Sequence, residues 1–315
     1  MLPETKSILE LSNHPSRLIN VEELLVIKDQ EQRYPIHSVV IGPTEGNIPT
    51  FGIYGGVHGL ERIGGQVAIS FLHSVAAQLM WDKGLNNFFK EARIVSIPII
   101  NPGGLARFTR SNLNGVDLMR NAPIEALNPL PLVSGHRISP LLPYFRGKEG
   151  APMELENQVL FDFIKKFHFS SEFSISLDVH SGFGFRDQIW YPYAKSTEQF
   201  PQLAETLKVL NIFEETVPHH VYKIEPQSKN YVVNGDVWDY FFDQHFYDTE
   251  RGGRIFIPLT LELGSWSWVK KNPLQLFSKL GLFNPVKGHR FSRTMRRHLL
   301  LLDFFRRIVK NNPFI

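Results

Sequence analysis

The chain of 315 residues has no cysteine, no long apolar run and only a small excess of positive charge. Without cysteine, disulfide bonds and thiolate ligands are excluded, so a metal site would consist of histidine, aspartate and glutamate side chains. No apolar stretch approaches the ~20 residues that a helix needs to cross a bilayer, so we expect no membrane partner. A formal net charge of +3 is too small to indicate nucleic acid as a partner.

The first residues lack the basic segment and apolar run of a secretory signal peptide, so we expect the protein in the cytoplasm. With 43% hydrophobic and 21% charged residues, the composition is that of a globular protein. No low-complexity linker or internal repeat divides the chain, and we expect a single domain over residues 1–315. Basic residues gather only at 290–297 and 306–307, where a solvated helix face is favoured over a phosphate-binding patch.

Mostly apolar segments alternate with amphipathic ones along the chain, which predicts an α/β fold. Strands are expected at 34–41, 51–55, 93–100, 173–179 and 255–263, and helices near 62–81, 153–167, 201–210, 235–245 and 295–310. Residues 42–47 have the composition of a hairpin turn between the first two strands. This alternation indicates a mixed, mostly parallel twisted sheet with helices on both faces.

A long segment rich in proline, glycine and asparagine follows the third strand. It spans residues 101–150 and shows no strong period. A loop of that length is uncommon in a compact domain unless it has a function.

Three of the strands end in polar side chains. A glycine-rich turn after the strand 51–55 carries His58 and Glu61, three residues apart, so both can point at one ion. His180 follows the polar face of the strand 173–179, and Glu262 lies near the end of the strand 255–263. Ligands bind beyond the carboxyl ends of strands in such sheets, so we expect these four side chains to meet there.

Two histidines and one carboxylate would leave one position on zinc open for water or substrate. We therefore expect one Zn²⁺ per chain, bound by His58, Glu61 and His180. Zinc lowers the pKa of bound water towards ~7, and a carboxylate that is not a ligand, here Glu262, would take the proton and pass it to the leaving amine. The structural alternatives are a capped turn for the first pair, a core histidine for His180 and a buried salt bridge for Glu262.

Five blocks, in the same order along the chain, resemble the zinc metallocarboxypeptidases of the carboxypeptidase A type. They are residues 58–61, 101–104, 110–121 and 177–181, and 260–263 preceded by Tyr231 and residues 235–240. A lone His-x-x-Glu would be a weak signal, but five ordered blocks between residues 51 and 264 are a strong one. The resemblance implies the fold of that family, and a divergent, bacterial-like cytoplasmic member that acts on a peptide or amide substrate.

The resemblance also implies roles for further residues in catalysis. His58, Glu61 and His180 would bind zinc, and Glu262 would be the general base and acid. Arg110 would polarise the scissile carbonyl and stabilise the oxyanion. Arg107 is an alternative for this role.

For four more residues the resemblance implies a catalytic role (Tyr231), substrate binding (Arg120 and Trp238) and orientation of a metal ligand (Asp117). Arg120 would bind a substrate carboxylate, and Asp117 would orient the ring of His58, with a loop cap as its alternative. Tyr231 matches the flexible tyrosine that closes over bound substrate, unless it is an ordinary half-buried tyrosine. Trp238 matches the position that lines the side-chain pocket.

One departure from the family concerns the substrate. The family usually has Asn-Arg where this chain has Met119-Arg120, and Met119 cannot donate a hydrogen bond to a terminal carboxylate. The expected activity is hydrolysis of a peptide or amide bond next to a carboxylate-bearing residue, and ordinary C-termini are in doubt as substrates. The alternatives are an N-acyl amino acid deacylase of the aspartoacylase and succinylglutamate desuccinylase type, and a metal-binding protein without turnover.

Overall fold

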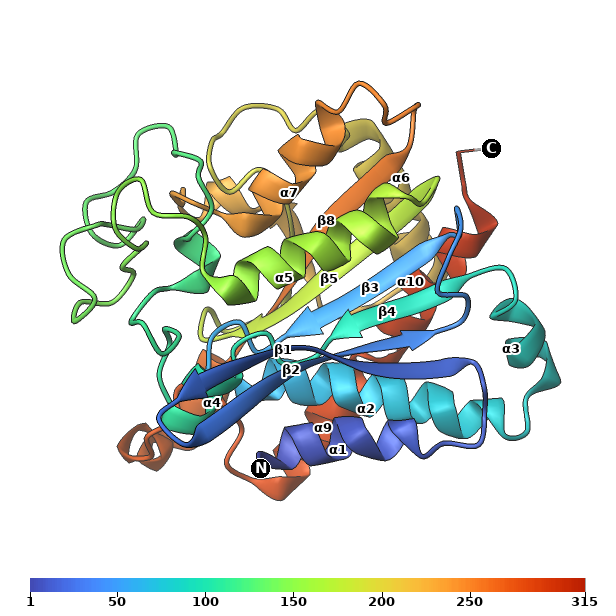
Figure 1. Ribbon diagram of the computed structural model, residues 1–315, viewed down its shortest axis with the longest axis horizontal. Coiled ribbons are helices and arrows are strands. Elements are labelled where there is room, and N and C mark those ends of the chain that lie inside the picture. Colours follow the sequence, from blue (N-terminus) through green and yellow to red (C-terminus); the bar gives the residue numbers. More distant parts are fainter. Residues whose placement is uncertain (315) are drawn as a thin grey trace.

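The computed structural model describes residues 1–314, and an eight-stranded sheet runs through its centre (Figure 1). The strand order is β1-β2-β4-β3-β5-β8-β6-β7. The strands are β1 (Ile19–Asp29), β2 (Gln32–Ile41), β3 (Thr50–Gly55), β4 (Arg93–Ile97), β5 (Phe173–Ser181), β6 (Gln188–Tyr191), β7 (Lys223–Pro226) and β8 (Ile255–Leu263). The central strands β4, β3, β5 and β8 are parallel, and antiparallel pairs join β1, β2 and β6 to them. The predicted α/β fold with a mixed sheet is confirmed.

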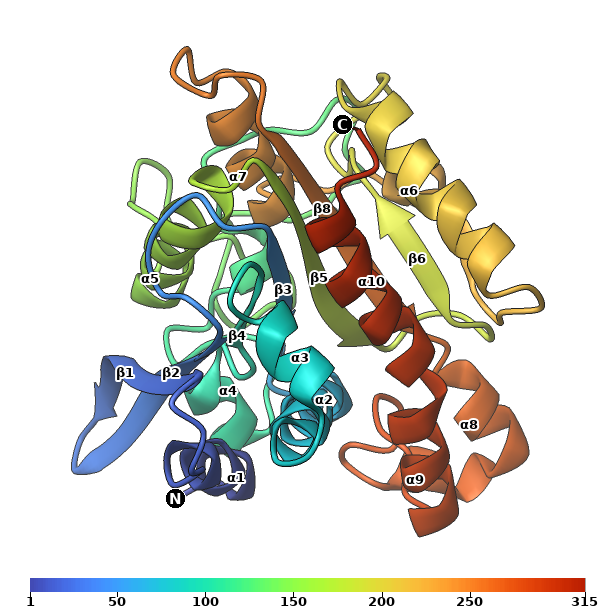
Figure 2. The ribbon, with the colours of Figure 1, turned by 90° about the vertical axis from the view of Figure 1, so that its right-hand side faces the viewer.

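Helices cover both faces of the sheet (Figure 2). They are α1 (Pro3–Ser12), α2 (Arg62–Leu79), α3 (Lys83–Phe88), α4 (Pro102–Arg107), α5 (Leu155–Ile164), α6 (Leu203–Thr216), α7 (Val237–Phe246), α8 (Trp266–Lys271), α9 (Gly288–Arg297) and α10 (Leu299–Asn311). One apolar core lies between the sheet and α1, α2, α6 and α10, and a second lies between the sheet and α5 and α7. Both faces are therefore closed to water, as a largely parallel sheet requires.

Strand β5 shows how the sheet positions polar side chains. Phe173, Ile175, Leu177 and Val179 pack into the first core, while the alternate residues 174, 176, 178 and 180 face the other side and are also buried. In the ladder between β5 and β8, His180 lies opposite Glu262. The expectation that these two residues meet at the carboxyl ends of neighbouring strands is confirmed.

The predicted hairpin at 42–47 is wrong. Strand β2 pairs with β4, and β4 lies between β2 and β3, so this segment is a crossover and not a hairpin. Strand β4 ends at Ile97, three residues earlier than expected, because Pro98 has no N–H to continue a ladder. The sequence pattern also missed β1 and β7, the two edge strands, and β6, which lies beside β7.

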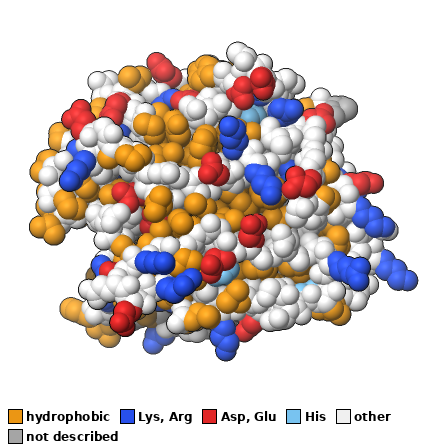
Figure 3. Space-filling view, viewed as in Figure 1, with side chains coloured by type: hydrophobic (Ala, Val, Ile, Leu, Met, Phe, Trp, Pro, Cys, Tyr) orange, Lys and Arg blue, Asp and Glu red, His pale blue; other side chains and the backbone are white. Residues whose placement is uncertain are grey.

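The basic segment near the C-terminus differs from its prediction too. The expected single helix is two helices, α9 and α10, separated at His298. Arg306 is buried and pairs with Asp303, so it does not lie on a solvated face. On the face drawn in Figure 3, Lys and Arg side chains are interspersed with Asp and Glu. None of the helices within residues 1–314 is both long and apolar enough to cross a membrane.

A buried histidine in the second core makes stability depend on pH. His245 packs between the rings of Phe169 and Phe256, and neither of its ring nitrogens has a hydrogen-bond partner among the described residues. Burial, aided by the charges of Arg251 and Arg254, lowers the pKa of His245 to about 4. The unfolded chain binds a proton there below its ordinary pKa of 6.5, whereas the folded chain does not until about 4, so stability falls as the pH drops through that window.

We predict that His245→Phe reduces this pH dependence. The wild type should lose about 2–3 kcal/mol more stability than the variant between pH 7.5 and pH 4.5, measured by urea unfolding. His289→Phe, at an exposed position, is the control and should follow the wild type. Parallel curves for wild type and His245→Phe would contradict the assignment.

Candidate metal centre

The turn that carries His58 is held by close backbone packing. Strand β3 ends at Gly55, and a side chain on Gly59 would place its Cβ 2.0 Å from the carbonyl carbon of Gly104. The amide of Asn101 donates to the carbonyl of Val57, and its oxygen accepts from the N–H of Gly104. The sequence blocks 58–61 and 101–104 are thus one packed unit, which fixes the direction of the His58 side chain.

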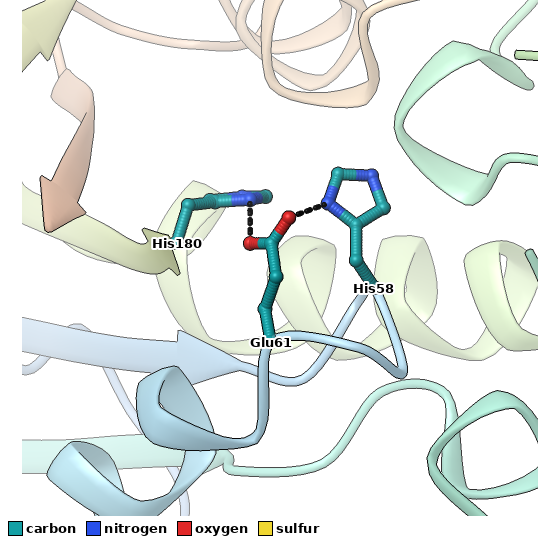
Figure 4. Close-up of side chains that lie close together, drawn as sticks. All are labelled: His58, Glu61 and His180. Atoms are coloured by element: carbon teal, nitrogen blue, oxygen red, sulfur yellow. Dashed lines mark hydrogen bonds and ion pairs between the residues drawn. The ribbon is translucent and has the colours of Figure 1, made fainter. Parts of the chain in front are cut away.

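The structure brings His58, Glu61 and His180 together (Figure 4). One ligand atom from each lies within 4.8 Å of the other two, and all three residues are buried. Glu61 lies between the imidazoles: its Oε1 is 2.9 Å from Nδ1 of His58, and its Oε2 is 3.2 Å from Nδ1 of His180. Although burial opposes ionisation, both histidines favour the carboxylate and hold the pKa of Glu61 well below its usual range.

A buried carboxylate holds the far nitrogen of each imidazole. Nε2 of His58 lies 3.1 Å from Oδ1 of Asp117, and Nε2 of His180 lies 2.8 Å from Oδ2 of Asp178. Both Nδ1 atoms therefore face the same point as the Glu61 carboxylate. This is the arrangement in which metal-binding histidines occur, since the second nitrogen fixes the ring and its tautomer. Two imidazoles and a carboxylate are donors that Zn²⁺ accepts, so the residues fit a zinc ion.

Asp117 connects the metal site to two arginines. Its Oδ2 accepts from Nε of Arg110 at 2.8 Å and from Nη1 of Arg120 at 2.9 Å. Burial opposes ionisation of Asp117, but the charges of these arginines and of His58 outweigh it and hold its pKa well below its usual range. Its Oδ1 also accepts from the N–H of Met119, so Asp117 is both a cap and a partner of His58. The ring of Tyr144 lies against both guanidinium groups, 5.1 Å from that of Arg110 and 4.5 Å from that of Arg120.

A cavity of about 580 Å³ is lined by most of the expected site residues. Glu262 lines it, and its Oε1 accepts from the N–H of Phe183 at 2.9 Å. Burial, together with the charge of Glu61, raises the pKa of Glu262 to about 8. Tyr231 also lines the cavity, and burial raises its pKa to about 12. Among the expected residues the lining includes His58, Glu61, Arg110, Met119, Arg120, His180, Tyr231 and Glu262.

Two expected positions lie elsewhere. Trp238 is not among the residues that line this cavity: it is buried against Tyr54, and its indole N–H donates to Asp178 at 2.8 Å. Trp238 therefore supports the partner of His180 and is not placed as a wall of a side-chain pocket. Arg107, the alternative to Arg110, is half exposed and pairs with Asp29, away from the cavity.

Sequence reasoning missed two residues of the site. Asp178 carried a readable signal, since residues two apart on a strand share a face and His180 follows it at that spacing. Tyr144 carried none, because it lies in the irregular segment 101–150 and its place depends on tertiary packing. This segment also contributes Arg110, Arg120, Val133 and Pro143 to the cavity.

Comparison with known families decides the affiliation. The family model described as zinc carboxypeptidase matches residues 16–264. The chain belongs to the zinc carboxypeptidase family. The resemblance seen in the sequence blocks is thereby confirmed, and with it the assignment as a zinc metallocarboxypeptidase-like hydrolase. No curated protein matches the chain.

Solved structures show the same fold at low sequence identity. Carboxypeptidase A from Helicoverpa armigera is 17% identical with a TM-score of 0.69, over 97% of this chain and 72% of that chain. Bovine thrombin-activatable fibrinolysis inhibitor, in complex with tick carboxypeptidase inhibitor, is 17% identical with a TM-score of 0.66, over 98% and 96%. A metallo-carboxypeptidase from Burkholderia cenocepacia is 12% identical with a TM-score of 0.61, over 99% and 69%. Zn²⁺ is the cofactor of this family, and the His-Glu-His group can hold one ion.

We predict that Asp178→Asn weakens zinc binding. Loss of the carboxylate on Nε2 of His180 should lower the affinity for zinc by about 10–100-fold, measured by competition with a chromophoric chelator. Asp162→Asn, an exposed position on α5, is the matched control. Equal affinities of wild type and Asp178→Asn would show that Asp178 does not orient the ligand.

Proposed function

We propose that the protein is a zinc-dependent hydrolase that cleaves a peptide or amide bond next to a carboxylate-bearing residue. We further propose that residues 1–315 act as one catalytic domain, since the site draws on residues from 58 to 262. The observation that carries the proposal is that the ligand group, Glu262, Arg110 and Arg120 all open into the same cavity.

The proposed ligands are His58, Glu61 and His180. Zinc bound by them lowers the pKa of a coordinated water and acts as a Lewis acid. Glu262 is the proposed general base, because it lines the same cavity and lies opposite His180 across the β5–β8 ladder. Its Oε1 is held by the N–H of Phe183, which orients the carboxylate so that it can accept a proton and return it to the leaving amine.

Arg110 is proposed to stabilise the oxyanion. Its Nε is bound to Asp117, and its Nη1 lies 3.6 Å from Oε1 of Glu61, so the guanidinium is held at the edge of the metal site. A positive group that is already oriented costs little reorganisation when negative charge develops on the substrate oxygen. Tyr231, which lines the same cavity and whose ring packs against Phe183 and Trp190, is proposed to close over the substrate.

Arg120 is proposed to bind the carboxylate of the substrate. Its Nη1 is bound to Asp117 and its Nη2 donates to the carbonyl of Val133, while its buried Nε has no partner among the described residues. A buried guanidinium N–H without an acceptor favours an anionic ligand, because leaving it unpaired is costly. Met119, beside it in the lining, adds no donor, so Arg120 would bind the carboxylate without the usual amide neighbour.

We predict that Glu262→Gln separates metal binding from turnover. The variant should keep about one zinc per chain by elemental analysis, whereas kcat should fall about 10²–10⁴-fold with loss of the general base. Glu215→Gln, at an exposed position on α6, should retain wild-type rates. An active, zinc-replete Glu262→Gln protein would rule out this mechanism.

A second prediction concerns the substrate carboxylate. Arg120→Gln should lower kcat/KM by about 10–100-fold for substrates with a free carboxylate, the size of a hydrogen bond to a charged group, and much less for the same substrates as primary amides. The panel contains C-terminal peptides, γ-linked peptides and N-acyl amino acids, so it also identifies the preferred class.

The matched control for this experiment is Lys148→Gln, an exposed cation in the segment that ends before α5. It should leave both substrate forms unaffected. An equal loss on acid and amide substrates in Arg120→Gln would mean that Arg120 supports the site through Asp117 alone.

A further inference from the structure

A second cavity, of about 550 Å³, lies between α8, α9 and the segment that follows β5. Figure 2 shows α8 and α9 side by side below α10. The cavity shares no lining residue with the metal centre: Gly182 and Phe183 line the first cavity, and residues 185–187 line the second. The lining comprises Phe185, Arg186, Asp187, His220, Val221, Ser267, Trp268, Lys271, His289, Arg290, Arg293, Thr294 and Arg297.

The cavity wall has a strong excess of positive charge. It contains five Lys and Arg side chains and only one acidic side chain, Asp187. Asp187 is buried and already bound on both oxygens, by the N–H of Gly264 at 2.9 Å and by Nη1 of Arg297 at 2.8 Å. The charge of Asp187 is therefore compensated by Arg297. The other four cations of the lining have no acidic side chain in the cavity wall to pair with.

The cations come from three different elements and point into one space. Arg290, Arg293 and Arg297 lie at spacings of three and four residues on α9, so they share one face of that helix. Lys271 comes from the end of α8, and Arg186 from the segment after β5. Nη1 of Arg290 donates to the carbonyl of Trp268 at 2.8 Å, which joins α9 to α8 and fixes the wall.

Three of these cations have no partner in the part of the chain that the structure describes. Within residues 1–314, Arg186, Lys271 and Arg293 make neither an ion pair nor a side-chain hydrogen bond, although all three line the same cavity. All three residues are solvent-exposed. Like charges that line one concave surface nevertheless repel one another and concentrate a positive field. The sequence favoured a solvated helix face for residues 290–297; Arg293 and Arg297 are exposed, and together with Arg290 they line this cavity.

We propose that this cavity binds a small multivalent oxyanion, one that carries phosphate or several carboxylate groups. Guanidinium groups bind such oxygens through paired charge-assisted hydrogen bonds, and an anion would relieve the repulsion among Arg186, Lys271 and Arg293. The volume lies in the range of small-molecule sites, ~300–1,000 Å³, so the ligand is small and not a long polymer. The proposal does not depend on the proposed hydrolase activity.

The test is calorimetric titration of the zinc-bound full chain with inorganic phosphate and, separately, with tricarballylate, at constant ionic strength. We expect saturable binding at one site per chain, and at least about tenfold weaker binding in Arg186→Gln/Arg293→Gln. Neither arginine has an internal partner to lose, so this variant should unfold at the wild-type temperature without ligand. The stronger of the two probes distinguishes a phosphorylated ligand from a polycarboxylate.

Arg17→Gln, an exposed arginine elsewhere on the chain, is the matched control and should bind both probes as the wild type does. Zinc content is measured before and after titration, to detect any metal removed by the probe. A probe that binds the metal instead of the cavity would be recognised because its binding signal persists in the double variant. The proposal is overturned by three outcomes: neither probe binds, the double variant binds as tightly as the wild type, or only long polyanions such as heparin bind.

Discussion

The structure depends on one carboxylate shared by two imidazoles. Glu61 meets Nδ1 of His58 with one oxygen and Nδ1 of His180 with the other, and buried aspartates hold the far nitrogens. Asp117 is also paired with the guanidinium groups of Arg110 and Arg120, so part of the buried negative charge is compensated within the protein. Buried carboxylates are costly unless they are paired, and a cation held by Glu61 and the two imidazoles would compensate them further.

This constraint explains why the site is assembled from distant parts of the chain. Parallel strands bring their carboxyl ends to one edge, so β3 delivers His58 and Glu61 while β5 and β8 deliver His180 and Glu262. The irregular segment between α4 and α5 lies on the same side in Figure 1 and adds the arginines. The strands position the proposed metal ligands and the proposed base, and the loop positions the arginines that are proposed to contact substrate. This division lets substrate preference change without disturbing the metal site.

The sequence predicted the positions of the metal-site residues better than it predicted the remaining strands and loops. Strong periodicity in β5 and β8 placed His180 and Glu262 at strand ends, because alternation is a local property of the chain. Strands β6 and β7 could not be recognised in the sequence, since each has only four residues, too few to show a period. The hairpin at 42–47 failed for a related reason: turn composition indicates a change of direction but not which strand becomes the neighbour. A motif gives the position of Trp238 in the chain, whereas the direction of its ring depends on the packing of α7 and could not be predicted from the sequence.

The arginine that is proposed to bind substrate also ties the long loop to the metal centre. Arg120 donates to Asp117 through Nη1 and to the backbone carbonyl of Val133 through Nη2. A carboxylate is a stronger acceptor than a neutral carbonyl, so a substrate anion would compete with Val133 for the same guanidinium. The charge of the substrate would thus act on the loop through the contact between Arg120 and Val133. The position of His58 would stay fixed, because Asp117 holds its ring. The absence of a donor at Met119 strengthens this dependence, since no neighbouring amide shares the carboxylate with Arg120.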